Sequence, residues 1–167
     1  CGRAETSDPY AARCERLMNA LRADFPHNFW ASQPNRYFEE GLLVSAASDF
    51  GVMPSLFEPS GLVGEEFLAA GTPLVCSNTG GMRDRVVPYC EETRAGNGVL
   101  FTNNLHHALL QSLERVLQLF SSEGGHYEAL RANAAASACD VSKTASHWRA
   151  EICRLRACLA AARHSQH

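Results

Sequence analysis

Glu58 and Glu66 lie eight positions apart and flank Gly61, which opens a predicted helix. A helix begins with backbone N–H groups that lack intrahelical partners and with the positive end of its dipole, so it suits a phosphate group. A glycine at that point lets a ligand approach the backbone closely. The two carboxylates would then accept hydrogen bonds from sugar hydroxyls on either side of the phosphate. Spacing alone fits equally well with an exposed glutamate before a proline turn and a solvated helical glutamate.

A second loop of small residues, 77–81, also passes from a predicted strand into a predicted helix. This loop is predicted to form a second wall of the same binding cleft, next to the loop that contains Glu58, although glycine-rich turns end many strands. The chain has neither a G-x-G-x-x-G motif nor a P-loop lysine, so a dinucleotide-binding or P-loop ATPase site is excluded at the motif level.

These loops must be positioned by alternating strands and helices. Apolar runs predict strands at 29–31, 50–53, 73–76 and 98–101. Apolar residues at helical spacing, with Asp8 and Pro9 as the first start signal, predict helices at 9–24, 36–47, 61–70, 82–87, 105–120, 127–138 and 144–161. We expect Asn104 to cap the fifth of these, and residues 88–97 to form a surface loop.

This order predicts an α/β fold, a Rossmann-like parallel sheet with flanking helices and further C-terminal helices. Such sheets bind ligands outside the carboxyl ends of their strands. The loops after Met53, Cys76 and Phe101 are therefore the places where a site is expected.

Composition restricts the class of protein. The 167 residues are 46% hydrophobic and 20% charged, which is typical of one globular domain. Fifteen basic against 18 acidic residues give a net charge of −3. The chain therefore lacks the excess of positive charge that is typical of proteins that bind nucleic acids or membrane surfaces. Seven scattered cysteines without a C-x-x-C motif predict reduced thiols rather than disulfides or a zinc site. The adjacent His106 and His107 point to different faces of a helix and make a poor metal pair.

Residues 49–62 closely resemble the signature of glycogen synthases and of bacterial or plant-type starch synthases. Residues 71–75 and 79–84 continue that signature in register, and residues 96–101 resemble the family's next strand. The resemblance extends, more loosely, from about Gly2 to about Leu159.

The resemblance implies a retaining glycosyltransferase of the GT-B architecture, which has two Rossmann-like domains. Such enzymes move glucose from ADP-glucose or UDP-glucose to the non-reducing end of an α-1,4-glucan, without a metal or other cofactor. Residues 1–160 would be most of the C-terminal, nucleotide-sugar-binding domain, and residues 161–167 a polar tail. The partners would be the sugar nucleotide, the glucan and an N-terminal domain of the same parent chain, with no nucleic acid or membrane. We expect a cytoplasmic or plastid location, and a fragment that is inactive alone.

The same resemblance assigns roles around the first loop. Glu58 would be the first glutamate of the E-x7-E pattern and the catalytic residue, in contact with the glucosyl hydroxyls. Backbone groups of Ser60 and Gly61 would hold that sugar, and the Leu62 N–H would point at the diphosphate. Glu66 would contact the ribose.

Further residues would complete the donor site. Thr79, Gly80 and Gly81 would line the donor side. Tyr37 or Arg36 could stack on the nucleobase, although a core position for the aromatic residue is the simpler interpretation.

One position of the E-x7-E pattern departs from the family. The family often has Gln in place of Glu66, and the full E-x7-E is commoner in relatives such as sucrose synthases. A sucrose-synthase-like transferase and a non-catalytic regulatory or scaffolding module of the same fold therefore remain as alternatives.

Some residues have simpler interpretations than a role in the site. We expect a solvated cluster of charged side chains on a helix at Arg83, Asp84 and Arg85, with a phosphate-binding role for Arg83 as the alternative. Trp148 is interpreted as an interdomain or core contact.

Overall fold

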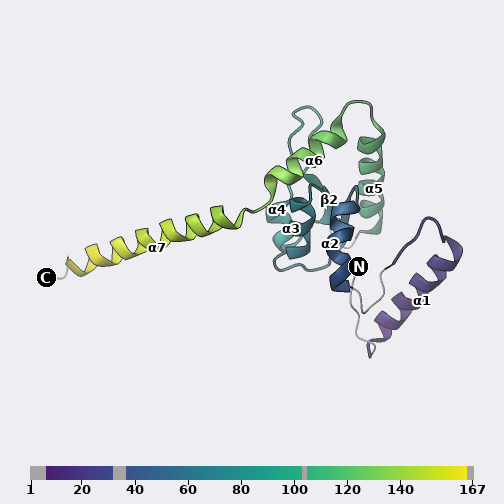
Figure 1. Cartoon of the computed structure of the whole chain (residues 1–167), viewed down its shortest axis with the longest axis horizontal. Helices are drawn as coiled ribbons and strands as arrows, with labels where there is room; N and C mark the ends of the chain where they lie inside the picture. The colour runs from purple at the N-terminus through teal and green to yellow at the C-terminus, as the bar shows by residue number, and fades with distance from the viewer. Residues whose placement is uncertain (1–6, 32–36, 103–104, 165–167) are drawn as a thin grey trace. The chain divides into compact units, whose positions relative to one another are not determined.

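The computed structural model describes residues 7–31, 37–102 and 105–164 (Figure 1). The chain divides into two compact units, Cys1–Asp49 and Phe50–His167. The assignment of residues 1–160 to one GT-B domain stays a prediction.

The described residues of the first unit form two helices, α1 (Pro9–Asp24) and α2 (Tyr37–Ala47). The Asp8 side chain accepts a hydrogen bond from the Tyr10 N–H at 2.9 Å, and proline occupies the first helical position, as predicted. The predicted start of α2, Arg36, lies outside the described residues.

The predicted strand at 29–31 is wrong. The Phe29 N–H donates instead to the Phe25 carbonyl at 2.9 Å, so a turn at the end of α1 satisfies the backbone. Trp30 is 60% exposed and has no strand neighbour in the described part of this unit. A three-residue apolar run forms a strand only where another strand offers it a ladder of hydrogen bonds.

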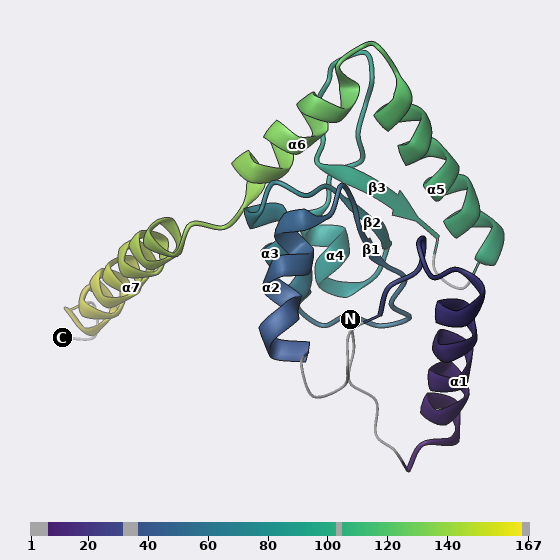
Figure 2. The ribbon, with the colours of Figure 1, turned by 45° about the vertical axis from the view of Figure 1, so that its right-hand side comes forward.

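The second unit contains the sheet. The strands β1 (Gly51–Met53), β2 (Leu74–Ser77) and β3 (Gly98–Phe101) pair in parallel in the order β1-β2-β3 (Figure 2). All four residues of β2, the central strand, are buried, as is usual for a parallel strand covered on both faces. The predicted α/β fold with a parallel sheet is confirmed.

Five helices accompany these strands: α3 (Leu62–Ala69), α4 (Gly80–Arg85), α5 (His106–Ser121), α6 (His126–Ser137) and α7 (Val141–His164). Helix α5 has Leu105 at its N-cap with no side-chain hydrogen bond there, and the predicted cap Asn104 lies outside the described residues. Helix α7 continues three residues past the predicted end at Ala161. In the described part of the chain, no helix has the length and apolar character needed to cross a membrane.

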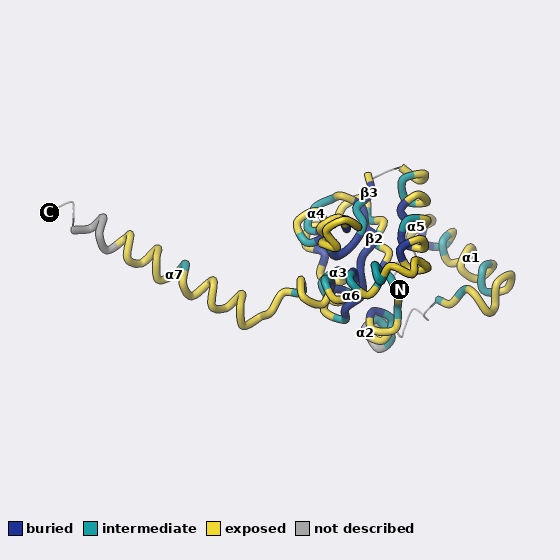
Figure 3. Tube along the Cα trace, turned by 90° about the horizontal axis from the view of Figure 1, so that it is seen from above, coloured by how far each residue is buried: buried dark blue, intermediate teal, exposed yellow. Residues whose placement is uncertain are grey.

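The side chains of β2 point alternately to the two faces of the sheet, and each face has its own hydrophobic core. Leu74 and Cys76 belong to a buried cluster with Leu68 of α3, Met82 of α4 and Ala134 of α6. Val75 lies in a separate buried cluster with Phe101 of β3 and Val116 of α5, because successive strand side chains point to opposite faces. Buried residues accordingly concentrate around β2 and β3 (Figure 3). The sheet is thus covered by α3, α4 and α6 on one face and by α5 on the other.

We expect the core thiol of Cys76 to resist alkylation. Its side chain is fully buried, and burial raises its pKa to about 12. Cys90 is exposed, and a hydrogen bond with the Thr93 side chain lowers its pKa. Iodoacetamide at about pH 8 should therefore label Cys90 in the native protein and Cys76 only after denaturation. Peptide mass spectrometry measures both sites, and equal native labelling would contradict the buried position of β2.

Candidate functional site

The loop after β1 ends in a glycine that the backbone requires. Gly61 is the N-cap of α3 and has φ +70°, a left-handed conformation that favours glycine. A Cβ at this position would lie 1.8 Å from Cε of Met82, so a larger residue would also require the buried Met82 side chain to move. The Gly61 N–H donates to Oε1 of Glu58 at 3.1 Å, which places the Glu58 carboxylate at the start of α3.

The loop after β2 is joined to the loop after β1. Three hydrogen bonds connect them: the Ser77 hydroxyl donates to the Ser55 carbonyl, the Thr79 hydroxyl to the Leu56 carbonyl at 3.5 Å, and the Gly81 N–H to the Glu58 carbonyl at 2.9 Å. The two loops follow adjacent parallel strands, so their carboxyl ends meet at the same edge of the sheet. The loop after β2, predicted from the sequence as the second wall of the cleft, therefore lies against the loop after β1.

Two glycines make this contact possible. A Cβ on Gly80 would lie 1.9 Å from the Glu58 carbonyl oxygen, and one on Gly81 would lie 2.4 Å from the Ser60 carbonyl oxygen. Gly80 also has φ +44°. The loops thus touch backbone to backbone, and the Gly81 N–H is already used in holding Glu58. Gly80 and Gly81 set the position of the first loop, while their predicted role in lining the donor site stays a prediction.

Arg85 and Glu65 are structural residues of the site that the sequence analysis missed. The Arg85 guanidinium donates to the Ser60 carbonyl at 2.9 Å and forms an ion pair with the Glu65 carboxylate. The other oxygen of Glu65 accepts the Cys139 N–H. The prediction of a solvated charge cluster is therefore wrong for Arg85, although Arg83 is exposed. The useful signal was the four-residue spacing from Gly81 to Arg85, which puts both on one helical face.

The neighbouring glutamates Glu65 and Glu66 differ in their surroundings. Glu66 is exposed and lies one helical turn after Leu62, which is 66% exposed. Residues four apart share a helix face, so these two predicted donor-site residues lie on the exposed face of α3. The Leu62 amide is in the first turn, where no side chain caps the helix.

Two exposed apolar side chains lie in the same loop and were not singled out from the sequence. Leu56 is 69% exposed and Phe57 is 75% exposed. Only the structure separates them from the core, since apolar side chains next to a strand are as easily read as core residues. They give the loop an apolar surface beside the Glu58 carboxylate.

Tyr37 is the predicted residue that the structure does not connect to these loops. It begins α2 in the first compact unit, and its side chain lies outside the described residues. Its stacking role stays a prediction. Among the residues that the structure describes, no three His, Cys, Asp or Glu side chains gather in a group able to hold a metal ion.

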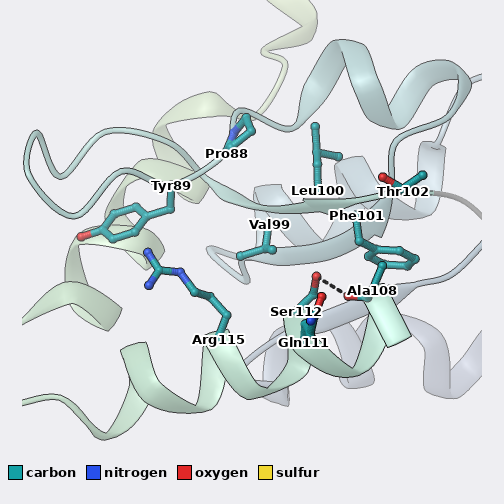
Figure 4. Close-up of a pocket in the computed structure, with 10 residues that line it drawn as sticks. All are labelled: Pro88, Tyr89, Val99, Leu100, Phe101, Thr102, Ala108, Gln111, Ser112 and Arg115. Atoms are coloured by element: carbon teal, nitrogen blue, oxygen red, sulfur yellow. Dashed lines mark hydrogen bonds between the residues drawn. The ribbon is translucent and has the colours of Figure 1, made fainter. Parts of the chain in front are cut away.

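A separate open pocket of about 430 Å³ lies between β3, residues 88–89 and α5 (Figure 4). Thr102, in the loop after Phe101 where a site is expected, lines it, but none of the residues that were assigned a role from the sequence does. Three of its polar side chains have partners: the Tyr89 hydroxyl bonds Nδ1 of His126 at 3.1 Å, the Ser112 hydroxyl donates to the Ala108 carbonyl, and Arg115 pairs with Glu91 at 2.6 Å. Burial raises the pKa of Tyr89, so its hydroxyl stays protonated. These three side chains are therefore held by other residues of the protein.

Comparison with known proteins settles the family. Residues 1–136 match the family described as "Glycosyl transferases group 1". The chain belongs to this family. The segment that carries the two joined loops lies inside the matched range.

Curated relatives of this family member are glycogen synthases. One from Finegoldia magna is 34% identical over 136 residues, which cover 80% of this chain and 28% of the relative. One from Bacillus cereus strain B4264 is 46% identical over 77 residues, covering 46% of this chain and 16% of the relative. One from Desulfitobacterium hafniense is 31% identical over 106 residues, covering 64% and 23%. The matched segments therefore cover only 16% to 28% of these relatives' length, and the predicted resemblance to glycogen and starch synthases is confirmed.

Solved structures show the same fold. The catalytic domain of starch synthase IV from Arabidopsis thaliana, bound to ADP and acarbose, matches with a TM-score of 0.64 and 21% identity. That match covers 90% of this chain and 30% of the other. A sucrose-phosphate synthase from Thermosynechococcus elongatus matches with a TM-score of 0.62 and 23% identity, covering 94% and 38%.

The substitution Gly80→Ala should separate the two loops. Its Cβ would overlap the Glu58 carbonyl, and φ is positive there, so we expect a loss of about 2 kcal/mol or more in the free energy of unfolding. Gly41→Ala is the matched control, because it lies in α2 and its Cβ would meet nothing within 4 Å. That control should gain about 0.5–1 kcal/mol. Urea denaturation followed by circular dichroism measures both, and a neutral Gly80→Ala would contradict the backbone contact.

The ion pair between Glu65 and Arg85 should show a measurable coupling energy. Their side chains are 21% and 29% exposed, so we expect about 1 kcal/mol in a double-mutant cycle of Glu65→Gln and Arg85→Met. The control cycle uses Glu151 and Arg154 of α7, an exposed pair that should couple less strongly. Equal coupling in the two cycles would show that the site pair is an ordinary surface contact.

Proposed function

We propose that this chain is the donor-binding part of a glycogen or starch synthase-like glucosyltransferase. The enzyme would transfer glucose from ADP-glucose or UDP-glucose to the non-reducing end of an α-1,4-glucan, with retention at the anomeric carbon. The observation that carries the proposal is the hydrogen bond from the Gly61 N–H to the Glu58 carboxylate, at the point where the two loops meet and α3 begins. A carboxylate beside a helix N-terminus can accept hydrogen bonds from a sugar while the helix binds the diphosphate joined to it.

The start of α3 suits the leaving group. When the glycosidic bond of a sugar nucleotide breaks, negative charge grows on the diphosphate. The uncapped first turn of α3 directs amides, that of Leu62 included, toward such charge, and the helix dipole has the favourable sign. Donors held in place before the reaction lower its barrier because nothing has to reorganise. Leu62 would thereby bind the diphosphate.

Glu58 suits the glucosyl group. Its carboxylate accepts one amide hydrogen bond, and a carboxylate has about four acceptor positions, so it can also receive sugar hydroxyls. Its negative charge would stabilise positive character that develops at the anomeric carbon. We assign it orientation and charge stabilisation rather than a covalent step, because a covalent mechanism needs a nucleophile positioned for attack.

The remaining contacts follow once the sugar is placed at Glu58 and the diphosphate at the start of α3. Ser60 and Gly61 would hold the sugar through their backbone, and Glu66, on the exposed face of α3, would bind the ribose. Thr79, Gly80 and Gly81 would form the second wall of the donor site. Tyr37 would stack on the base.

The acceptor side requires a second domain. The starch synthase IV structure that shares this fold contains ADP and acarbose, and this chain covers 30% of it. The exposed Leu56 and Phe57 side chains beside Glu58 support a surface that faces an N-terminal domain of the same parent chain. No cofactor enters this proposal.

One alternative has an observation of its own. Glu66 completes an E-x7-E pattern, and the sucrose-phosphate synthase structure matches this fold nearly as well as starch synthase IV does. A transferase that uses a sugar acceptor other than glucan is therefore the second candidate.

Glu58→Ala in the proposed full-length enzyme should reduce glucosyl transfer by about 100-fold or more. Removing the carboxylate takes away both sugar orientation and charge stabilisation. Glu92→Ala is the matched control, since Glu92 is exposed in the loop before β3 and should leave transfer unchanged. Radiolabelled glucose incorporated into glucan measures the rate, and calorimetric titration with ADP-glucose and UDP-glucose identifies the donor.

Unchanged transfer in Glu58→Ala would refute the role of Glu58. Transfer to fructose or another small sugar, with none to glucan, would favour the second candidate. Donor binding without transfer to any acceptor would favour a non-catalytic module of the same fold.

A further inference from the structure

The peptide unit between Ser60 and Gly61 is held at both of its ends. Its N–H, which belongs to Gly61, donates to Oε1 of Glu58 at 3.1 Å. Its carbonyl, which belongs to Ser60, accepts a hydrogen bond from Nε of Arg85 at 2.9 Å. The N–H and C=O of a trans peptide point in opposite directions within one plane, so a single orientation of that plane satisfies both bonds. The Glu58 carboxylate is thus joined to Arg85 through one peptide.

This peptide needs such support because a glycine follows it. Gly61 has φ +70°, and glycine adopts positive and negative φ about equally readily, so the plane before it can rotate at little steric cost. Rotation by about half a turn would direct the Ser60 carbonyl, rather than the Gly61 N–H, at the Glu58 carboxylate. Two negatively charged oxygens would then face each other. A bond to the carbonyl on the far side selects the orientation that binds Glu58.

Arg85 is itself fixed in place. A second N–H of its guanidinium, on Nη1, pairs with the Glu65 carboxylate, whose other oxygen accepts the Cys139 N–H. A guanidinium is planar, so bonds from two of its nitrogens to two acceptors determine where both donors lie. Gly81, four residues earlier in α4, leaves room for the Ser60 carbonyl, since a Cβ there would lie 2.4 Å from its oxygen. The donor and the acceptor of this bond are therefore both restrained.

The charge of Arg85 acts in the same direction as its geometry. A hydrogen bond from a cation is stronger than one from a neutral donor, and hydrogen bonds in a chain polarise one another. The guanidinium at the Ser60 carbonyl therefore strengthens the donation from the Gly61 N–H to Glu58. Gly61 is buried and Glu58 is half-buried, so water screens this chain of bonds only in part.

We propose that Arg85 is a positioning residue for Glu58. By holding the Ser60 carbonyl, it keeps the Gly61 N–H directed at the carboxylate that the glucosyl group would meet. Arg85 itself acts only through this peptide and contacts neither the sugar nor the diphosphate. The inference rests on the proposed function, because that function gives Glu58 its role in transfer.

Steady-state kinetics of the proposed full-length enzyme test this role. Arg85→Met should lower kcat for glucosyl transfer by about 10-fold and change KM for the sugar nucleotide by less than about twofold, because the Glu58 charge matters most in the transition state. In the Glu58→Ala background, the same substitution should cost less than about twofold, since its effect passes through that carboxylate. An equal loss in both backgrounds would overturn the inference.

Two further variants separate positioning from general damage to the fold. Arg94→Met is the matched control: Arg94 also donates to a backbone carbonyl, that of Gly124 at 2.8 Å, but it precedes β3 and so lies at the other end of the strands from the donor loops. A loss of kcat in this control as large as that in Arg85→Met would overturn the inference. Arg85→Lys keeps the charge but not the planar pair of donors, so its kcat should fall between those of the wild type and Arg85→Met. It takes the place of Arg85→Met in both backgrounds if circular dichroism shows that Arg85→Met does not fold.

Amide hydrogen exchange at Gly61, followed by NMR in the 167-residue chain, tests the hydrogen bond without any activity. Exchange should become about tenfold faster in Arg85→Met and stay unchanged in Arg94→Met. Unchanged exchange at Gly61 in Arg85→Met would overturn the inference even if the full-length enzyme transfers glucose. Faster exchange in a full-length protein that transfers no glucose would instead refute the proposed function, and with it the role in transfer, while showing that Arg85 holds the peptide.

Discussion

The candidate site depends on one close contact between two backbone segments. The Gly81 N–H is bonded to the Glu58 carbonyl at 2.9 Å, and the Cβ that any other residue would place at Gly80 would lie 1.9 Å from the same oxygen. Because this contact involves main-chain atoms, neither loop can move without the other. Adjacent parallel strands bring the loops to one edge of the sheet, and the buried strand β2 holds that edge in place. The position of the Glu58 carboxylate follows from the contact.

The surrounding residues strengthen this arrangement from outside. The Met82 side chain packs where a Cβ of Gly61 would stand, so the turn into α3 is fixed from the side of the core. Arg85 holds the Ser60 carbonyl, and Glu65 connects Arg85 to the backbone at Cys139. Helices α3 and α4, with the segment between α6 and α7, thereby hold this turn in place. A site that stabilises developing charge gains from this rigidity, since its donors are oriented before the reaction begins.

The sequence by itself determined the parallel sheet, the order of helices and strands in the second unit, and the two loops that would meet. The order of strands and helices, the helical spacing of apolar residues and the positions of glycines can be read from neighbouring residues, because they do not depend on contacts between distant parts of the chain. It failed at residues 29–31, where a strand needs a neighbour that the described part of the unit does not supply, and at Arg85, whose partners Ser60 and Glu65 are 25 and 20 positions away. It also could not separate the exposed Leu56 and Phe57 from core residues. Only the tertiary structure decided these points, because pairing and burial depend on residues that folding brings together from distant parts of the chain.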